Sequence, residues 1–402
     1  MTTEGINKIL INETSIDRTS ADRTLVDEIG KTTNSEKIAC APQIGDYQLI
    51  ADIIIQRCLG YKTMHCPPTT KRTLELGARH SPDMICTPFK TTLGNFIEAA
   101  EQGANVFLMP GFGCRLGVYD ILQQEVMNEL GYDCEFITLF EYIPTVKRMF
   151  NALNEVNPNL TQEKFDEVFE LIVQITLDMD SLAFFMRKNM AFEIGRHTAS
   201  QNRLAFKSQF EATYQAYLQD IRHVSNAAEA KNIGEKYQSL MQSIAIDKPE
   251  KSLRIGIIGE IYIVVEPSSN CNLEKWLADH QVEIIRYGSL SDMASAIFSV
   301  DEQIKNSGGY VDYNIGSTAN DAIARAYEMI HEGIDGIIHV KPSSCSPEIT
   351  AMSILQNISQ DFNVPFMYMT FDTETSEAGV HTRLEAFHDM ITMRRNQKGA
   401  TA

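Results

Sequence analysis

The chain has 402 residues, of which 44% are hydrophobic and 22% are charged. This is ordinary globular composition, and it excludes a disordered, collagen-like or coiled-coil protein. Its length predicts roughly two to three domains. The 35 Lys and Arg residues against 53 Asp and Glu residues give a formal charge of −18. So acidic a surface argues against general binding to nucleic acid or to an anionic membrane, although it permits a small basic pocket.

The hydropathy of the chain contains no apolar run of about 18 residues, the length that a membrane-spanning helix requires. The longest candidate, Ile255 to Val265, is too short and contains Glu260. The first ten residues lack the basic and then apolar pattern of a signal peptide. We therefore expect a cytoplasmic protein, in which the eight cysteines are thiols or metal ligands rather than disulfides.

The first third of the chain is predicted to hold one α/β domain. Residues 1–36 are polar and predict a loosely packed arm. Between residues 37 and 144, short apolar runs alternate with amphipathic stretches, a pattern typical of a parallel sheet with helices on both faces. The predicted strands are 37–41, 62–66, 83–86, 105–109 and 133–138, and the predicted helices are 46–59, 70–79, 91–102 and 118–130.

The remainder divides into a helical segment and a second α/β domain. Residues 145–250 show helical apolar spacing and no strand signal, with helices predicted at 162–177, 180–189 and 209–222. Residues 251–402 return to the alternating pattern. Strands are expected there at 253–259, 282–287, 336–340 and 365–370, and helices at 273–280, 318–331, 349–358 and 382–395. The fold class is α/β, with two parallel sheets separated by helices.

Three cysteines occupy equivalent predicted positions. Cys86, Cys114 and Cys345 are each expected between the end of a strand and the start of a helix. Ligands bind at that edge of open α/β sheets, and a helix N-terminus favours the thiolate that soft metals and iron–sulfur clusters require. A cysteine taken singly is more often a buried core residue than a ligand. Cys40, at the end of the first predicted strand, is a further candidate for the same crevice.

A glycine-rich turn offers a second interpretation. Gly111, Gly113 and Gly117 follow a predicted strand and precede a helix, as in a phosphate-binding turn, but with one residue more than GxGxxG. Arg115 could grip a phosphate or a carboxylate, or form an ordinary salt bridge. Glu260 ends a predicted strand, so it could face the inter-domain crevice or be a surface carboxylate. No P-loop and no zinc-hydrolase motif occurs.

Several of these segments resemble the 2-hydroxyacyl-CoA dehydratase/benzoyl-CoA reductase subunit superfamily, and most closely its activase-associated, double-cubane-cluster-like branch. The resemblance begins near Pro42 and extends to the C-terminus. It is carried by CTPFKTTLGN from Cys86, GFGCRLGVY from Gly111, GEIYIVVEP from Gly259, CSPE from Cys345 and TRLEAF from Thr382. The segment DTETSEAG departs from the family pattern, and residues 1–36 have no counterpart in it.

The resemblance implies two Rossmann-like domains with an iron–sulfur cluster between them, of the [4Fe–4S] or double-cubane type. Cys86, Cys114 and Cys345 fall on the cysteine motifs of the family and are its implied metal ligands. The implied partner is a separate ATP-dependent activase of the sugar kinase/actin fold, which delivers a low-potential electron. A second subunit or a second copy of the chain is also implied, with an acyl-CoA thioester as a possible acceptor in anaerobic metabolism.

Two other hypotheses remain open at this stage. A non-catalytic protein could bind a nucleotide or an acyl-CoA through Gly111, Gly113, Arg115 and Glu260, without any cluster. An accessory partner of the activase could bind it without turning over a substrate. The first of these predicts a colourless protein whose melting temperature rises with nucleotide or CoA thioester.

Overall fold

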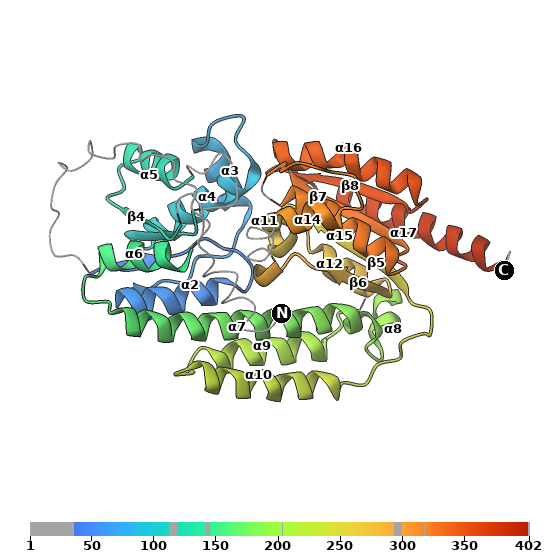
Figure 1. Ribbon diagram of the computed structural model, residues 1–402, viewed down its shortest axis with the longest axis horizontal. Coiled ribbons are helices and arrows are strands. Elements are labelled where there is room, and N and C mark those ends of the chain that lie inside the picture. Colours follow the sequence, from blue (N-terminus) through green and yellow to red (C-terminus); the bar gives the residue numbers. More distant parts are fainter. Residues whose placement is uncertain are drawn as a thin grey trace.

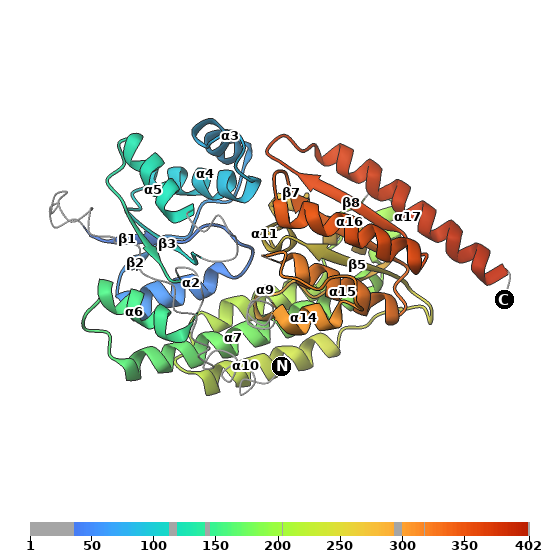
Figure 2. The ribbon, with the colours of Figure 1, turned by 45° about the horizontal axis from the view of Figure 1, so that its top comes forward.

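A computed structural model describes residues 36–111, 119–140, 145–202, 204–292, 300–316 and 318–400. Two α/β units lie side by side above a layer of long helices, as Figures 1 and 2 show. Each unit contains a four-stranded sheet in which all described strands run parallel. The predicted fold class, two parallel-sheet α/β units with helices between them in the sequence, is therefore confirmed.

The first sheet has the strand order β2-β1-β3-β4. Its strands are short: β1 (Ile38–Cys40), β2 (Lys62–Thr63), β3 (Val106–Met109) and β4 (Glu135–Thr138). The helices of this unit are α2 (Gln48–Ile54), which continues as the π-helical turn η1 (Ile55–Leu59), then α3 (Lys71–His80), α4 (Thr87–Glu101) and α5 (Tyr119–Glu129).

The strand predicted at 83–86 does not exist. These residues form a turn in which the N–H of Ile85 donates to the carbonyl of Pro82. The side chain of Met84 is 82% exposed, so the short apolar run is not a buried strand. Pro82 and Asp83 favour a turn, and only two apolar residues follow them before the helix. Cys86 consequently ends a turn rather than a strand.

The second sheet repeats this topology with longer strands, in the order β6-β5-β7-β8. They are β5 (Leu253–Gly259), β6 (Val282–Arg286), β7 (Gly336–Pro342) and β8 (Phe366–Phe371). The helical elements of the unit are α11 (Ile261–Val265), η3 (Pro267–Asn270), α12 (Leu273–Asp279), α14 (Val300–Asn306), α15 (Ala319–His331), α16 (Ser346–Asp361) and α17 (Glu377–Ala400). Both α16 and α17 begin earlier than their apolar spacing predicts.

The helical layer begins with α6 (Val146–Val156) and is dominated by α7 (Gln162–Asn189), which contacts both α2 and β6. The predicted helices 162–177 and 180–189 form one continuous helix. The acidic residues at their junction accept hydrogen bonds from other side chains while the helix continues through them. Gln174 donates to Asp178, and the hydroxyl of Tyr47 donates to Asp180. The layer is completed by η2 (Met190–Phe192), α8 (Arg196–Gln201), α9 (Gln209–Ile221) and α10 (Ala227–Gln242).

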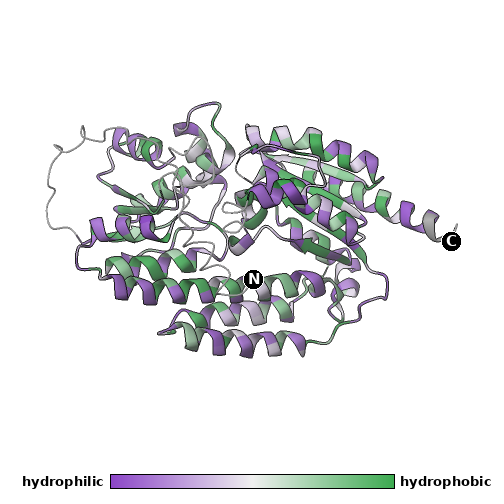
Figure 3. Cartoon of the chain, in the orientation of Figure 1, coloured by the Kyte–Doolittle hydropathy of each residue, from purple (hydrophilic) through white to green (hydrophobic). Residues whose placement is uncertain are grey.

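One continuous hydrophobic core joins the helical layer to both units. It includes Leu49 on α2, Ile175 on α7, Tyr217 on α9 and Ile284 on β6. Two smaller clusters fill the other faces of the sheets, under α4 and α5 in the first unit and under α15 and α16 in the second. Figure 3 shows hydrophobic residues along the strands of the second sheet, whereas hydrophobic and hydrophilic residues alternate along the long helices. The helical layer is thus the shared base on which both sheets rest.

Among the described helices, none combines the length and the apolar character needed to cross a bilayer.

Candidate functional site

The start of α4 in the first unit meets the loops that follow β7 and β8 in the second. The hydroxyl of Thr87 donates to the carbonyl of Phe371 at 3.0 Å and lies 3.3 Å from the hydroxyl of Ser343. In Figure 2 the two units approach each other at this level, above α7. The site predicted at the carboxyl edges of the sheets is therefore a contact region between the two units.

Two of the three predicted metal ligands lie in this region. Cys86 is the N-cap of α4 and Cys345 is the N-cap of α16, and each helix carries a proline in its first turn. Cys345 lies within electrostatic range of Cys86, although they belong to different units. The thiol of Cys86 also contacts the hydroxyl of Tyr119 on α5. The structure thus places two thiols at equivalent helix starts near one another.

A buried polar network supports Cys345. Glu348, in the first turn of α16, is fully buried; its Oε2 lies 2.7 Å from Nε2 of His339, and its Oε1 accepts from the hydroxyl of Thr318 at 3.0 Å. His339, on β7, is fully buried as well. The sequence analysis missed this network, because a His in a strand and a Glu in a helix show no shared motif. These two hydrogen bonds hold the Glu348 carboxylate near Cys345.

The thiol of Cys345 is not acidified by its position. Burial raises its pKa, the Glu348 carboxylate raises it further, and the backbone N–H of Glu348 opposes both. The expectation that a helix N-terminus would lower this pKa is therefore wrong for Cys345, because desolvation outweighs one backbone dipole. Lys341 is 6% exposed at the end of β7, close enough for the Cys345 and Glu348 charges to act on it. It is a nearby cation that the sequence analysis did not identify.

Glu260 follows β5 and lies near Cys345. It is the N-cap of α11, and its Oε2 accepts from the N–H of Ile263 at 3.1 Å. Burial raises its pKa to about 7, and the charge of Glu348 raises it as well. Its charge in turn acts on Cys345, so the carboxyl belongs to the same group of side chains.

Only the first residue of the predicted glycine turn can be placed. Gly111 has a φ of +78°, and a Cβ there would lie 2.2 Å from the carbonyl oxygen of Phe140, so only glycine fits. Gly113, Cys114 and Arg115 lie outside the described residues. The phosphate-binding interpretation and the third thiol ligand therefore remain predictions.

Two further thiols lie together beneath the first sheet's edge. Cys40 ends β1 and Cys66 follows β2; both are buried, and a hydrogen bond with Cys66 is the largest cause of the raised pKa of Cys40. Burial raises the pKa of Cys58, which is buried, and of Cys134, which is half-buried, to about 11. Across the described ranges, no three His, Cys, Asp or Glu side chains form a group that could hold a metal ion.

Comparison with known proteins identifies the family. The sequence model described as 2-hydroxyglutaryl-CoA dehydratase, D-component, matches residues 55–391, a span that contains Cys86, Cys114, Cys345 and Glu260. No curated protein matches the chain. The matched span takes in most of the first unit, the helical layer and the second unit, and on this ground the chain belongs to the 2-hydroxyglutaryl-CoA dehydratase D-component family.

Proposed function

We propose that this chain is the iron–sulfur component of a 2-hydroxyacyl-CoA dehydratase-type system. It would accept a low-potential electron from a separate ATP-dependent activase and pass it to an acceptor that is difficult to reduce, such as an acyl-CoA thioester. The observation that carries the proposal is the approach of Cys86 and Cys345 from opposite units at equivalent helix starts, in a chain of this family.

The residues at the site fit an iron–sulfur cluster chemically. Thiolates are the usual ligands of such clusters, and Cys114 is the proposed third ligand beside Cys86 and Cys345. The backbone N–H of Glu348 and the ammonium of Lys341 lie close to Cys345, where they would offset the negative charge that thiolate ligands bring. A bound [4Fe–4S] or double-cubane cluster would supply one-electron reduction at low potential.

The other side chains of the site have supporting roles in this proposal. Glu348, held by His339 and Thr318, fixes the first turn of α16 and therefore the direction of the Cys345 thiol. The contact of Thr87 with Ser343 and Phe371 holds the start of α4 against the second unit. Glu260 closes the site from the end of β5. Together these contacts fix the separation of the two thiols, which a cluster shared between units requires.

The test is anaerobic purification followed by iron and acid-labile sulfide analysis and a visible spectrum. About four irons per chain, or about eight for a double cluster, are expected. Cys86→Ala, Cys114→Ala and Cys345→Ala should each lose most of the iron and the broad visible absorbance. Cys58→Ala, which removes a buried thiol in η1 away from the site, is the matched control and should keep both.

Full iron in all three variants would refute the ligand assignment. A protein that takes up no iron on anaerobic reconstitution, and that is stabilised by a nucleotide or a CoA thioester, would favour the non-catalytic binding hypothesis instead. If the cluster is present, adding an activase of the sugar kinase/actin fold with ATP should reduce it, and omitting ATP should prevent the reduction. Equal reduction without ATP would count against the proposed partner.

A further inference from the structure

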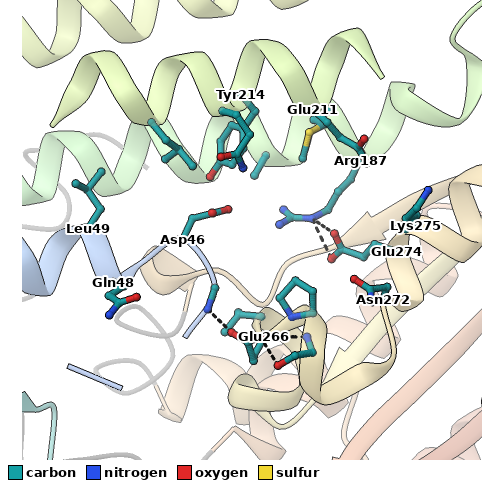
Figure 4. A pocket seen from close by; sticks show the side chains of 18 of the residues that line it. Asp46, Gln48, Leu49, Arg187, Glu211, Tyr214, Glu266, Asn272, Glu274 and Lys275 are labelled. Atoms are coloured by element: carbon teal, nitrogen blue, oxygen red, sulfur yellow. Dashed lines mark hydrogen bonds and ion pairs between the residues drawn. The ribbon is translucent and has the colours of Figure 1, made fainter. Parts of the chain in front are cut away.

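A cavity of about 810 Å³ lies between the helical layer and the two α/β units. Its walls come from the β1–α2 loop and α2, from α7 and α9, and from the segment α11 to α12, while β6 contributes Arg286. Figure 4 shows Asp46, Arg187 and Tyr214 directed toward its interior from three different elements. Neither Cys86, Cys345 nor Glu260 lines it, so it is distinct from the site described above. Its volume is in the range of ordinary small-molecule sites.

Two buried arginines lie together in the wall of the cavity. Arg187 and Arg286 are both more than nine-tenths buried, and both pair with the same carboxylate, Glu274. The Nε of Arg187 donates to Glu274 at 2.9 Å, and the Nε of Arg286 lies 2.8 Å from it. Two guanidinium groups share one carboxylate, and buried charge without a partner is costly. Among the described residues, Glu274 is the one carboxylate in direct contact with both arginines.

Among the described residues, Asp180 and Glu266 form no direct ion pair with either arginine. Asp180 is engaged by the hydroxyl of Tyr47 and by the N–H of Ser291 at 2.9 Å. Glu266 accepts from the N–H groups of Gly45 and Ser268. Asp46 faces the cavity, but among the described residues no hydrogen bond or ion pair joins its carboxylate to Arg187 or Arg286.

The terminal nitrogens of Arg187 face the open space. In the described part of the chain, neither terminal nitrogen donates a hydrogen bond, and only Nε is paired, with Glu274. The residue is 8% exposed and lines this cavity. The hydroxyl of Tyr214, on a side chain that is 5% exposed, likewise has no hydrogen bond there and points into the cavity. The free edge of a planar guanidinium, formed by its two terminal nitrogens, matches a carboxylate, and a neighbouring hydroxyl adds a third donor.

We propose that this cavity binds a small organic molecule with a single carboxylate, which the terminal nitrogens of Arg187 and the hydroxyl of Tyr214 receive. Apolar side chains of the lining, Met186, Met190, Leu218 and Val264, take the hydrocarbon part of the ligand. A dianion such as phosphate fits less well, because four carboxylates also line the cavity: Asp46, Glu211, Glu266 and Glu274. The inference does not depend on a cluster, since the binding residues are separate from the cysteines.

The test is a binding titration, by calorimetry or ligand-observed NMR, with three probes: butyrate, its neutral isostere butyramide, and inorganic phosphate. Butyrate should bind at least about tenfold more tightly than butyramide, because only the carboxylate makes charge-assisted bonds. Hexanoate should bind roughly tenfold more tightly than butyrate, because it buries two more methylenes. Equal binding of butyrate and butyramide, tighter binding of phosphate, or no binding of butyrate would overturn the proposal.

Two variants separate the guanidinium geometry from charge. Arg187→Lys keeps the positive charge but loses the two-pronged contact, and should weaken butyrate binding about tenfold. Lys275→Gln removes a cation from the same cavity whose ammonium already pairs with Asp279 at 3.4 Å, and should leave binding within about twofold. Equal weakening in both variants would overturn the proposed role of Arg187. If Arg187→Lys does not fold, Tyr214→Phe provides the test, with a loss of about threefold expected and an unchanged affinity counting against the site.

Discussion

Cys86 and Cys345 occupy equivalent places in the two α/β units, but different kinds of contact hold them there. Both are N-caps of helices with an early proline, and both units have the same strand order. Cys345 follows the long strand β7 and rests on the buried network of Glu348, His339 and Thr318. Cys86 follows a turn, and its helix is positioned mainly by the packing of α3 against α4.

The α3–α4 contact depends on two glycines. A Cβ at Gly77 would lie 1.7 Å from the carbonyl oxygen of Lys90, and one at Gly94 would lie 2.0 Å from that of Thr73. The two helices therefore touch backbone to backbone, which places α4 without any strand before it. The comparison teaches that one topological position can be fixed either by buried polar bonds or by close helix packing. Each mechanism makes its unit sensitive to a different mutation.

The largest effect is expected from breaking the polar support of Cys345. Glu348→Ala leaves His339 and Thr318 without their shared acceptor, and His339 is fully buried, so we expect a loss of about 3–5 kcal/mol in unfolding free energy. Denaturant unfolding at pH 7 measures it. Glu348→Gln keeps the shape and an acceptor, and should lose less than about 1.5 kcal/mol. Equal losses in the two variants would show that the network is not what stabilises this position.

The next prediction concerns the pH dependence of the second unit. Burial raises the folded-state pKa of Glu260 from 4.5 to about 7, so the folded state favours the protonated carboxyl. The stability that this provides is fully present below pH 4.5 and is lost as the pH rises toward 7. Glu260→Gln is neutral at every pH and can still accept from Ile263. It should therefore be more stable than the wild type at pH 8, by up to about 3 kcal/mol, and equal to it near pH 4.

Melting temperatures across this pH range, in protein without added iron, provide the measurement. Glu75→Gln on α3, where the side chain is 55% exposed, controls for the removal of one negative charge. A difference between Glu260→Gln and the wild type that does not change between pH 4 and pH 8 would contradict the raised pKa of Glu260.

The smallest of the three effects tests the helix packing that positions Cys86. Gly94→Ala should cost about 2 kcal/mol, since overpacking of about 3 kcal/mol is offset by about 1 kcal/mol of helix propensity. Gly336→Ala is the matched change in the second unit, where the new Cβ would meet Cδ1 of Ile391 at 2.4 Å. A side-chain tip can rotate away whereas a carbonyl cannot, so this loss should stay within about 1 kcal/mol. Equal losses in denaturant unfolding would remove the proposed contrast between the units.

Much of the fold was predictable from local patterns. The apolar runs of β5, β6, β7 and β8 alternate with amphipathic helices, and that alternation requires a parallel sheet. The false strand at 83–86 shows where such reasoning fails, because two apolar residues beside a proline carry too little periodicity to distinguish a strand from a turn. The helix break predicted near Asp178 and Asp180 is wrong for a similar reason. The local sequence does not show which side chains donate hydrogen bonds to these carboxylates.

By itself, the sequence determined the α/β class, the helical layer and the positions of Cys86 and Cys345 at helix starts, because each depends on residues close together in the chain. Only the tertiary structure decided which residues the starts of these helices contact. Thr87 meets Ser343 across 256 positions, and Arg187 meets Glu274 across 87. The pairing of His339 with Glu348 and the unpaired guanidinium edge in the cavity were decided there too. Contacts of this kind depend on how elements pack, and no local pattern specifies the partner.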